Sequence, residues 1–197
     1  MTEKPRRVKP SNWNVPNVLT VLRIVLVPVF VVLLFMEPEN QFWRLMATLV
    51  FIVAMLTDLA DGHIARKYNL ITDFGKLWDP VADKALTGAA FVSLSILGEL
   101  PWFFTIIILL REWGITWVRA VIAKYWIMAA NKGGKLKTLT QTFALILFSL
   151  WLPGLPGAVQ VLAWLLMWAA LILTVVTGID YLKHAWAIRR KGKAEAR

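Results

Sequence analysis

Five aspartates lie within residues 57–86, between two hydrophobic runs, although the chain of 197 residues has only 12 acidic residues. They are Asp58, Asp61, Asp73, Asp79 and Asp83. Asp58 and Asp61 are three residues apart, and Asp79 and Asp83 are four apart, so each pair shares one face of a helix. Two neighbouring helices could therefore bring four carboxylates together at one end of a helical bundle.

Four carboxylates in one place repel each other unless a cation holds them. The chain has no cysteine, and its two histidines, His63 and His184, are not at ligand spacing, so oxygen ligands remain. Oxygen ligands favour Mg²⁺ or Mn²⁺, and the sequence leaves both open. Two such ions close together clamp the attacking and leaving oxygens in phosphoryl transfer. A solvated acidic loop is the alternative, but it does not explain helical spacing within apolar flanks.

The elements that must position these acids are hydrophobic. Residues of hydrophobic type make up 58% of the chain. Apolar runs cover 15–36, 42–57, 85–97, 101–123, 138–152 and 157–182. Because about 20 apolar residues span a bilayer, we predict an all-α integral membrane protein with six transmembrane helices, the third beginning in the Asp79–Asp83 region. A large soluble helical core would leave too little polar surface to cover it.

The net charge of +10 is concentrated on one side of this expected bundle. With six spans, that side carries the two termini and the polar segments 58–84 and 124–137, whereas the loops "EPENQ", "GELP" and "PGLPG" lie opposite. The positive-inside rule predicts a multi-pass protein of the cytoplasmic membrane whose termini and polar active-site cavity face the cytoplasm. Membrane lipids account for the basic residues, so we expect no nucleic-acid partner.

The expected organisation is a basic juxtamembrane arm at 1–14, a six-helix domain at 15–188 and a basic cytoplasmic tail at 189–197. Residues 1–14 are charged and no small-residue cleavage site follows the first apolar run, so no cleavable signal is expected. Asn14-Val15-Pro16-Asn17 is a helix-start signal. The longer polar segments 58–84 and 124–137 are where function is expected.

The spacing of the acids resembles a known signature, that of the CDP-alcohol phosphotransferase family. The matching residues are Asp58-x2-Asp61-Gly62-x2-Ala65-Arg66-x8-Gly75-x3-Asp79-x3-Asp83. The resemblance implies six transmembrane helices, a site for two metal ions, and transfer of a phosphatidyl or related group from a CDP-linked donor to an alcohol, with release of CMP. It also suggests a homodimer. Asp73 lies outside the signature and is expected to be a loop acid or a helix cap.

The resemblance assigns roles residue by residue. Asp58, Asp61 and Asp79 resemble the metal ligands, and Asp83 resembles the general base, a metal ligand, or both. The residues expected to bind CDP-diacylglycerol are Asn17, Thr20, Gly62, Arg66 and Thr72, with a weaker indication for Arg23. Gly62 would let the cytidine nucleotide approach the backbone.

The acceptor is expected to carry a phosphate. Arg111 and Arg119 interrupt an apolar span eight residues apart, and Lys135 and Lys137 follow Gly133-Gly134, where accessible backbone N–H groups could bind an anion. Positive-inside topology explains the lysines equally well, and Arg111 could instead pair with Glu112 or Asp180.

These motifs resemble the branch of the family that joins CDP-diacylglycerol to sn-glycerol 3-phosphate, giving phosphatidylglycerophosphate in phospholipid biosynthesis. The branch that uses inositol phosphate is the nearest alternative. A metal-ion or proton-coupled transporter is an alternative of another class. A transporter would be expected to place charges near the bilayer midplane in several helices, often with repeats, and this chain shows neither pattern.

Overall fold

The computed structural model describes residues 14–68, 70, 72–122 and 132–195. These residues form six α-helices and one short 3₁₀ helix, and no strand occurs among them. The chain divides into two compact units, residues up to Ala89 and residues from Ala90 on, with the boundary inside α3 (Asp73–Ile96). The predicted all-α class is confirmed. The predicted boundaries of the arm, the domain and the tail stay predictions.

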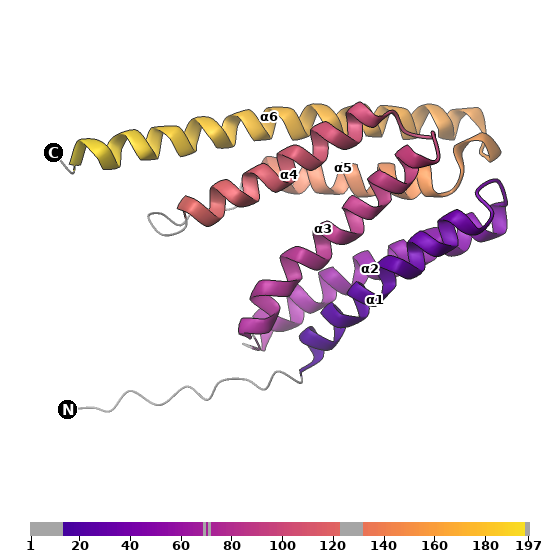
Figure 1. Ribbon diagram of the computed structural model, residues 1–197, viewed down its shortest axis with the longest axis horizontal. Helices are drawn as coiled ribbons and strands as arrows, with labels where there is room; N and C mark the ends of the chain where they lie inside the picture. Colours follow the sequence, from indigo (N-terminus) through magenta and orange to yellow (C-terminus); the bar gives the residue numbers. More distant parts are fainter. Residues whose placement is uncertain (1–13, 69, 71, 123–131, 196–197) are drawn as a thin grey trace. The chain divides into compact units, whose positions relative to one another are not determined.

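The first unit contains an antiparallel helix pair, α1 (Val15–Met36) and α2 (Gln41–Lys67), which lie side by side (Figure 1). α1 begins where the sequence predicts, because the Asn14 side chain accepts a hydrogen bond from the Asn17 N–H at 3.0 Å and caps the helix. Between the two helices, Phe30 and Phe51 are fully buried with ring centroids 5.4 Å apart.

The polar segment 58–84 is mostly helical rather than a long connection. α2 continues through both of its aspartates to Lys67, and α3 begins at Asp73, so only residues 68–72 join them. The start of α3 is capped by Thr72, whose hydroxyl accepts the Gly75 N–H at 3.0 Å. Each aspartate pair therefore lies on one helix, as predicted, and the third helix includes its acidic turns.

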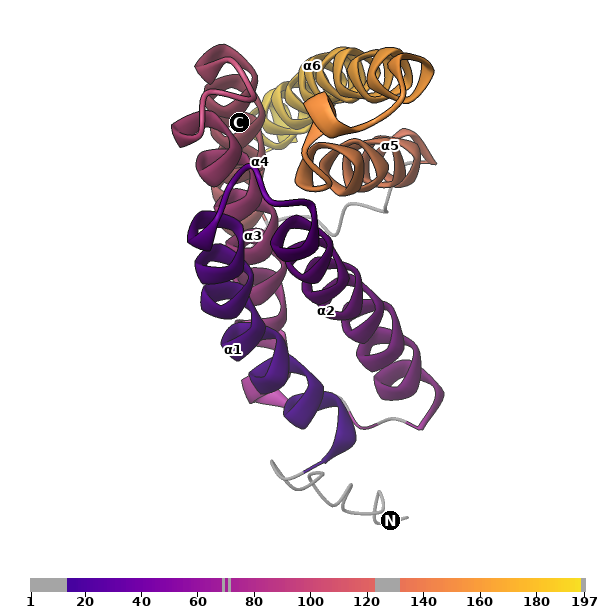
Figure 2. The same cartoon turned by 90° about the vertical axis from the view of Figure 1, so that its right-hand side faces the viewer.

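The second unit contains the end of α3, α4 (Trp102–Ile122), α5 (Lys132–Ser149), the 3₁₀ helix Leu152–Gly154 and α6 (Gly157–Glu195). α6 packs against both α5 and α4, and Figure 2 shows α5 beside α6. Aromatic rings pack between these helices. The ring centroids of Trp164 and Phe148 are 5.0 Å apart, and those of Trp168 and Phe104 are 4.9 Å apart. Gly98, between α3 and α4, has φ +74, which favours glycine.

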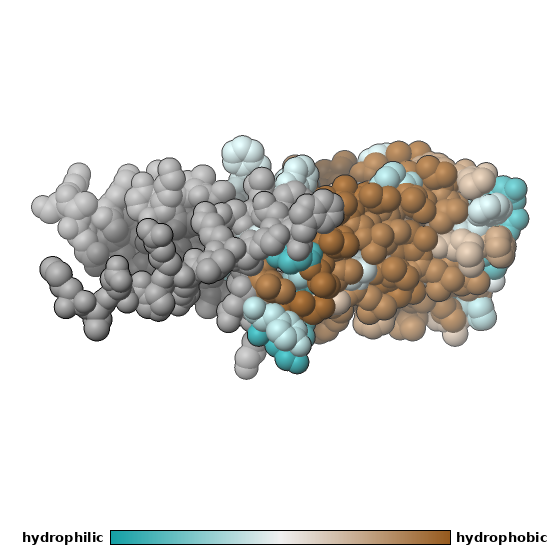
Figure 3. All heavy atoms as spheres, turned by 90° about the horizontal axis from the view of Figure 1, so that it is seen from below, coloured by the Kyte–Doolittle hydropathy of each residue, from teal (hydrophilic) through white to brown (hydrophobic). Residues whose placement is uncertain are grey.

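The helix surfaces are apolar. Val25 on α1 is 54% exposed and Leu165 on α6 is 63% exposed. In Figure 3, most of the surface that is coloured by hydropathy is brown, the colour of hydrophobic residues. Within the part of the chain that the structure describes, three helices are long and apolar enough to cross a membrane by length and composition, namely Val15–Met36, Gln41–Ala65 and Gly157–Lys183. Such surfaces suit a lipid environment. The chain is a multi-pass membrane protein, as the sequence predicts.

Candidate active site

A polar stripe on α1 connects the acidic turns of the first unit. Asn17, Thr20 and Arg23 are each 4% exposed or less, although this helix is otherwise apolar. They follow each other at intervals of three residues, which keeps them near one face of the helix. Each contacts a residue of the acidic segment, so α1 is the element that holds the segment in place.

Arg23 binds the two aspartates of α2. Its Nη1 forms an ion pair with Asp58 Oδ1 at 2.6 Å, and its Nη2 donates a hydrogen bond to Asp61 Oδ2. The Arg23 side chain is fully buried, whereas those of Asp61 and Asp58 are 4% and 32% exposed. One guanidinium therefore holds two carboxylates at once, Asp61 by a charge-assisted hydrogen bond and Asp58 by an ion pair.

Thr20 binds the first aspartate of α3. Its hydroxyl donates to Asp79 Oδ1 at 2.6 Å and also contacts the Pro16 carbonyl at 3.1 Å. A charge-assisted bond of this kind fixes the orientation of the carboxylate. The aspartates of α2 and α3 are thus both oriented from neighbouring turns of α1.

Asn17 closes the stripe at the start of α3. Its Oδ1 accepts a hydrogen bond from the Thr72 hydroxyl at 2.8 Å. A Cβ added at Gly75 would lie 3.2 Å from Asn17 Oδ1 and 3.4 Å from Asp79 Oδ2, so a side chain there would crowd both. This close approach explains why the signature has a glycine, rather than a residue with a side chain, at position 75.

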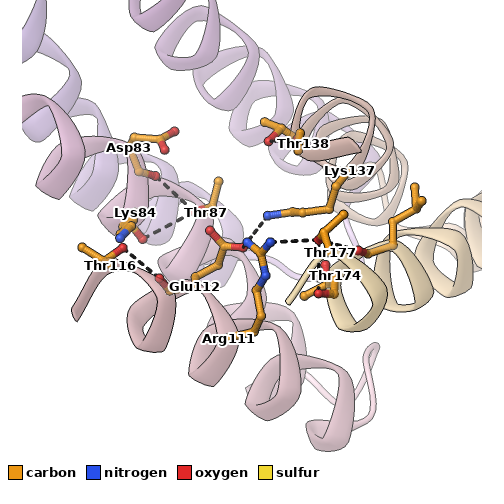
Figure 4. A network of polar contacts seen from close by, with 12 residues as sticks. Asp83, Lys84, Thr87, Arg111, Glu112, Thr116, Lys137, Thr138, Thr174 and Thr177 are labelled. Atoms are coloured by element: carbon orange, nitrogen blue, oxygen red, sulfur yellow. Dashed lines mark hydrogen bonds and ion pairs between the residues drawn. The ribbon is translucent and has the colours of Figure 1, made fainter. Parts of the chain in front are cut away.

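The remaining signature residues lie on the same two helices. Asp83 and Gly62 are half-buried. The Asp83 main-chain carbonyl accepts the Thr87 hydroxyl at 3.1 Å (Figure 4). The side chain of Arg66, expected to bind the diphosphate, lies outside the described part of the structure, as does that of Asp73.

The donor chemistry of the four aspartates fits a hard divalent cation, because every candidate ligand is a carboxylate oxygen. Among the described residues, no group of three or more acids or histidines is gathered at metal-binding distance. Instead, Arg23 joins Asp58 and Asp61 and Thr20 holds Asp79. The sequence reasoning considered only external cations for the acids and missed Arg23 as an internal one. An arginine one turn after Thr20 in an apolar span was the available signal.

The second unit holds a separate polar cluster, formed by Arg111, Glu112, Lys137 and Thr177 (Figure 4). Arg111 Nη1 donates to Glu112 Oε1 at 2.9 Å, and Lys137 Nζ donates to the same oxygen. Arg111 Nη2 donates to the Thr177 hydroxyl at 2.8 Å. The sequence offered Glu112 and Asp180 as partners of Arg111, and the structure shows the contact with Glu112. The cluster ties α4 to α5 and α6.

The predicted acceptor residues are only partly brought together. Lys137 is 4% exposed and faces the cluster, whereas Lys135 is exposed, because residues two apart lie on nearly opposite faces of a helix. Gly133 and Gly134 lie in the first turn of α5 rather than in a loop. The side chain of Arg119 is outside the described residues.

A glycine on α6 lets Arg111 approach closely. A Cβ added at Gly178 would lie 3.1 Å from Arg111 Cγ. The bare helix surface therefore accommodates the aliphatic part of Arg111, while the guanidinium reaches the neighbouring Thr177. Neither Gly178 nor Thr177 was predicted from the sequence, because nothing in the sequence indicates how α4 and α6 pack.

Known proteins resemble this chain over most of its length. The family described as CDP-alcohol phosphatidyltransferase matches residues 13–176. A protein of Mycobacterium tuberculosis named probable phosphatidylglycerophosphate synthase is 44% identical over 173 residues, covering 87% of this chain and 81% of the relative. Proteins named CDP-diacylglycerol–glycerol-3-phosphate 3-phosphatidyltransferase are similar too. That of Rickettsia typhi is 36% identical (86% and 96% covered), and that of Bacillus subtilis 35% (88% and 96%).

The match covers the acidic signature and three residues of the cluster, Arg111, Glu112 and Lys137, and ends one residue before Thr177. It favours a transferase over the transporter alternative, and the resemblance based on the signature is confirmed. The chain belongs to the CDP-alcohol phosphatidyltransferase family.

Proposed function

We propose that this protein transfers the phosphatidyl group of CDP-diacylglycerol to sn-glycerol 3-phosphate, giving phosphatidylglycerophosphate and CMP. The observation that carries the proposal is the acidic signature on α2 and α3, oriented by buried polar residues of α1. The names of relatives at 35–44% identity favour glycerol 3-phosphate over inositol phosphate as the acceptor.

Asp58, Asp61, Asp79 and Asp83 are the residues that would hold two Mg²⁺ or Mn²⁺ ions. When bound, these ions neutralise charge on the diphosphate and polarise the acceptor hydroxyl. Arg23 and Thr20 orient three of these carboxylates from α1. The chain therefore supplies both the ligands and the side chains that keep them in place.

Asp83 would act as the general base. The acceptor hydroxyl oxygen forms a bond to the β-phosphorus of CDP-diacylglycerol while the bond between that phosphorus and the CMP oxygen breaks. The hydroxyl proton passes to the Asp83 carboxylate, and CMP leaves with the electron pair of the broken bond.

Different residues would bind the donor and the acceptor. Gly62 and Arg66 on α2 would receive the donor, together with Asn17, Thr20 and Thr72, whose described bonds already organise the acidic turns. Arg111, Arg119, Lys135 and Lys137 would receive the acceptor phosphate, with Lys137 the most buried of the described cations in this set. The active site and both termini would face the cytoplasm, and the protein would act as a homodimer.

The test supplies purified full-length protein with CDP-diacylglycerol and, in parallel, sn-glycerol 3-phosphate, inositol phosphate, glycerol or serine. Release of CMP and the lipid product are followed together. We expect turnover with sn-glycerol 3-phosphate only. Turnover with inositol phosphate instead would overturn the acceptor assignment, and the absence of CMP release with every acceptor would overturn the activity.

A further inference from the structure

Glu112 makes contacts in the second unit that resemble those of a bound phosphate. A single oxygen, Oε1, accepts hydrogen bonds from Arg111 on α4 and Lys137 on α5 (Figure 4). Arginine and lysine are the side chains that bind phosphate oxygens, and a bridging oxygen between two cations is a common arrangement for a bound anion. The carboxylate therefore lies at the position where an acceptor phosphate would have to meet both cations.

The cluster brings two cations to one carboxylate oxygen. The Lys137 side chain is only 5% exposed, so its charge meets the anion away from bulk solvent. Electrostatic attraction is stronger where water is excluded. A dianionic phosphate carries more negative charge than a carboxylate and could therefore compete with it for the same two cations.

Unpaired polar atoms accompany the cluster. Arg111 Nε, Gln141 Oε1 and Thr174 Oγ1 are buried without a hydrogen-bond partner in the described structure. Gln141 follows Lys137 by four residues and Thr174 precedes Thr177 by three, so each lies on the helix face that carries the cluster. Buried polar groups are normally satisfied, and these three offer two donors and an acceptor to a ligand with phosphate and hydroxyl groups.

We propose that Glu112 is an internal competitor of the acceptor: its carboxylate competes with the acceptor's phosphate for Arg111 and Lys137 and so sets the affinity for phosphorylated acceptors. The identity of the acceptor in this inference rests on the proposed function. The competition between anions for Arg111 and Lys137 does not depend on it. Glu112 is a specificity-determining residue in this account, since a neutral alcohol could not displace it.

The test compares the full-length protein with Glu112→Gln, which keeps the shape and removes the charge. Inorganic phosphate is the first probe, with sodium chloride at matched ionic strength as reference. We expect phosphate to raise the thermal unfolding midpoint more in Glu112→Gln than in the unmodified protein, and to bind about tenfold more tightly. The apparent KM for sn-glycerol 3-phosphate should fall about fivefold to twentyfold, with the KM for CDP-diacylglycerol unchanged.

Two further variants control the test. Glu39→Gln removes an exposed carboxylate from the loop after α1 and should leave phosphate binding unchanged. The double variant Glu112→Gln/Lys137→Met removes one charge of each sign, which protects folding should the single variant be unstable. The gain in phosphate binding should disappear in it.

An equal or smaller effect of phosphate in Glu112→Gln would show that Glu112 only ties the helices together, and would overturn the inference. So would a gain that persists in the double variant. If the unmodified protein releases no CMP with sn-glycerol 3-phosphate, the proposed function fails, and the phosphate measurements still decide the competition.

Discussion

The guanidinium of Arg23 lies 2.6 Å from the carboxylate of Asp58 and is fully buried. Through its other terminal nitrogen the same group binds Asp61, three residues further along α2. The first helix of the protein thus provides the positive charge that holds together the first half of the family signature. The signature acids depend on a residue that is not part of the signature.

Replacing Arg23 by Gln should strongly destabilise the first unit. Removing one partner of a buried ion pair leaves the other charge uncompensated, which typically costs about 3–5 kcal/mol, and Asp61 is buried. We expect a clear fall in the thermal unfolding midpoint in detergent. The double variant Arg23→Gln/Asp61→Asn should recover part of the loss, because the orphaned carboxylate is gone. An unchanged midpoint in Arg23→Gln would contradict a stabilising ion pair.

The hydroxyl of Thr20 should control the orientation of Asp79. Thr20→Val removes the 2.6 Å bond to Asp79 Oδ1 and leaves a side chain of similar shape. Loss of a group that orients a metal ligand typically costs about 10–100-fold in metal affinity or activity. We expect a weaker Mn²⁺ affinity, measured by titration, and slower CMP release. Thr20→Ser keeps the hydroxyl and should stay close to the unmodified protein, and equal losses in both variants would assign the effect to packing.

Much of the first unit could be predicted from the sequence, because the signals that begin and continue its helices lie within a few residues of each other. The Asn14 cap, the two aspartate pairs and the apolar runs fix where α1, α2 and α3 form. The partners of the aspartates could not be predicted, since Arg23 is 38 residues from Asp61 in the chain. Such contacts depend on how helices pack, and packing leaves little trace in a single sequence.

The polar cluster of the second unit shows the same limit. The sequence indicates Arg111 within an apolar span and both Lys135 and Lys137 at the end of the polar segment before the next span, and it does not distinguish the two lysines. Only the helical rotation, which places Lys137 inside and Lys135 outside, separates the two. The contact between Lys137 and Glu112 joins residues 25 apart in the chain. The sequence indicated Glu112 only as one of two candidate partners of Arg111.

Activity should depend on a divalent cation. The four signature aspartates offer carboxylate oxygens, the ligands that Mg²⁺ and Mn²⁺ prefer, on two successive helices. We expect chelator to abolish CMP release, Mg²⁺ or Mn²⁺ to restore it, and Asp58→Asn or Asp79→Asn to reduce it by several orders of magnitude. Asp73→Asn, outside the signature, is the matched control and should change turnover by no more than a few-fold. Full turnover in chelator would exclude the proposed ions.

The two lysines of α5 should differ in their effect on the acceptor. Lys137→Ala removes a buried cation of the Arg111–Glu112 cluster, so we expect the apparent KM for sn-glycerol 3-phosphate to rise about 10–100-fold. Lys135→Ala removes an exposed charge and should raise it by less than about threefold, because solvent and salt screen such charges. The KM for CDP-diacylglycerol should stay constant in both variants. A larger effect from Lys135 would move the acceptor site to the outer face of α5.

Asp83 is the residue on which the chemical step should depend. It follows Asp79 by one helical turn, so its carboxylate can meet the incoming hydroxyl while Asp79 is held by Thr20. Asp83→Asn keeps the shape of the side chain and removes the base. We therefore expect CDP-diacylglycerol to bind with at most a modest loss of affinity, whereas kcat falls about 10²–10⁴-fold, the usual contribution of general-base catalysis.

Binding by calorimetry and CMP release should be measured on the same preparation of Asp83→Asn. Because the Asp83 main-chain carbonyl, rather than its side chain, accepts the Thr87 hydroxyl, the substitution leaves that helical contact intact. Near-normal turnover would transfer the role of base to another group, such as a donor phosphate oxygen. A loss of donor binding as large as the loss of rate would instead make Asp83 a ligand that organises the site without taking the proton.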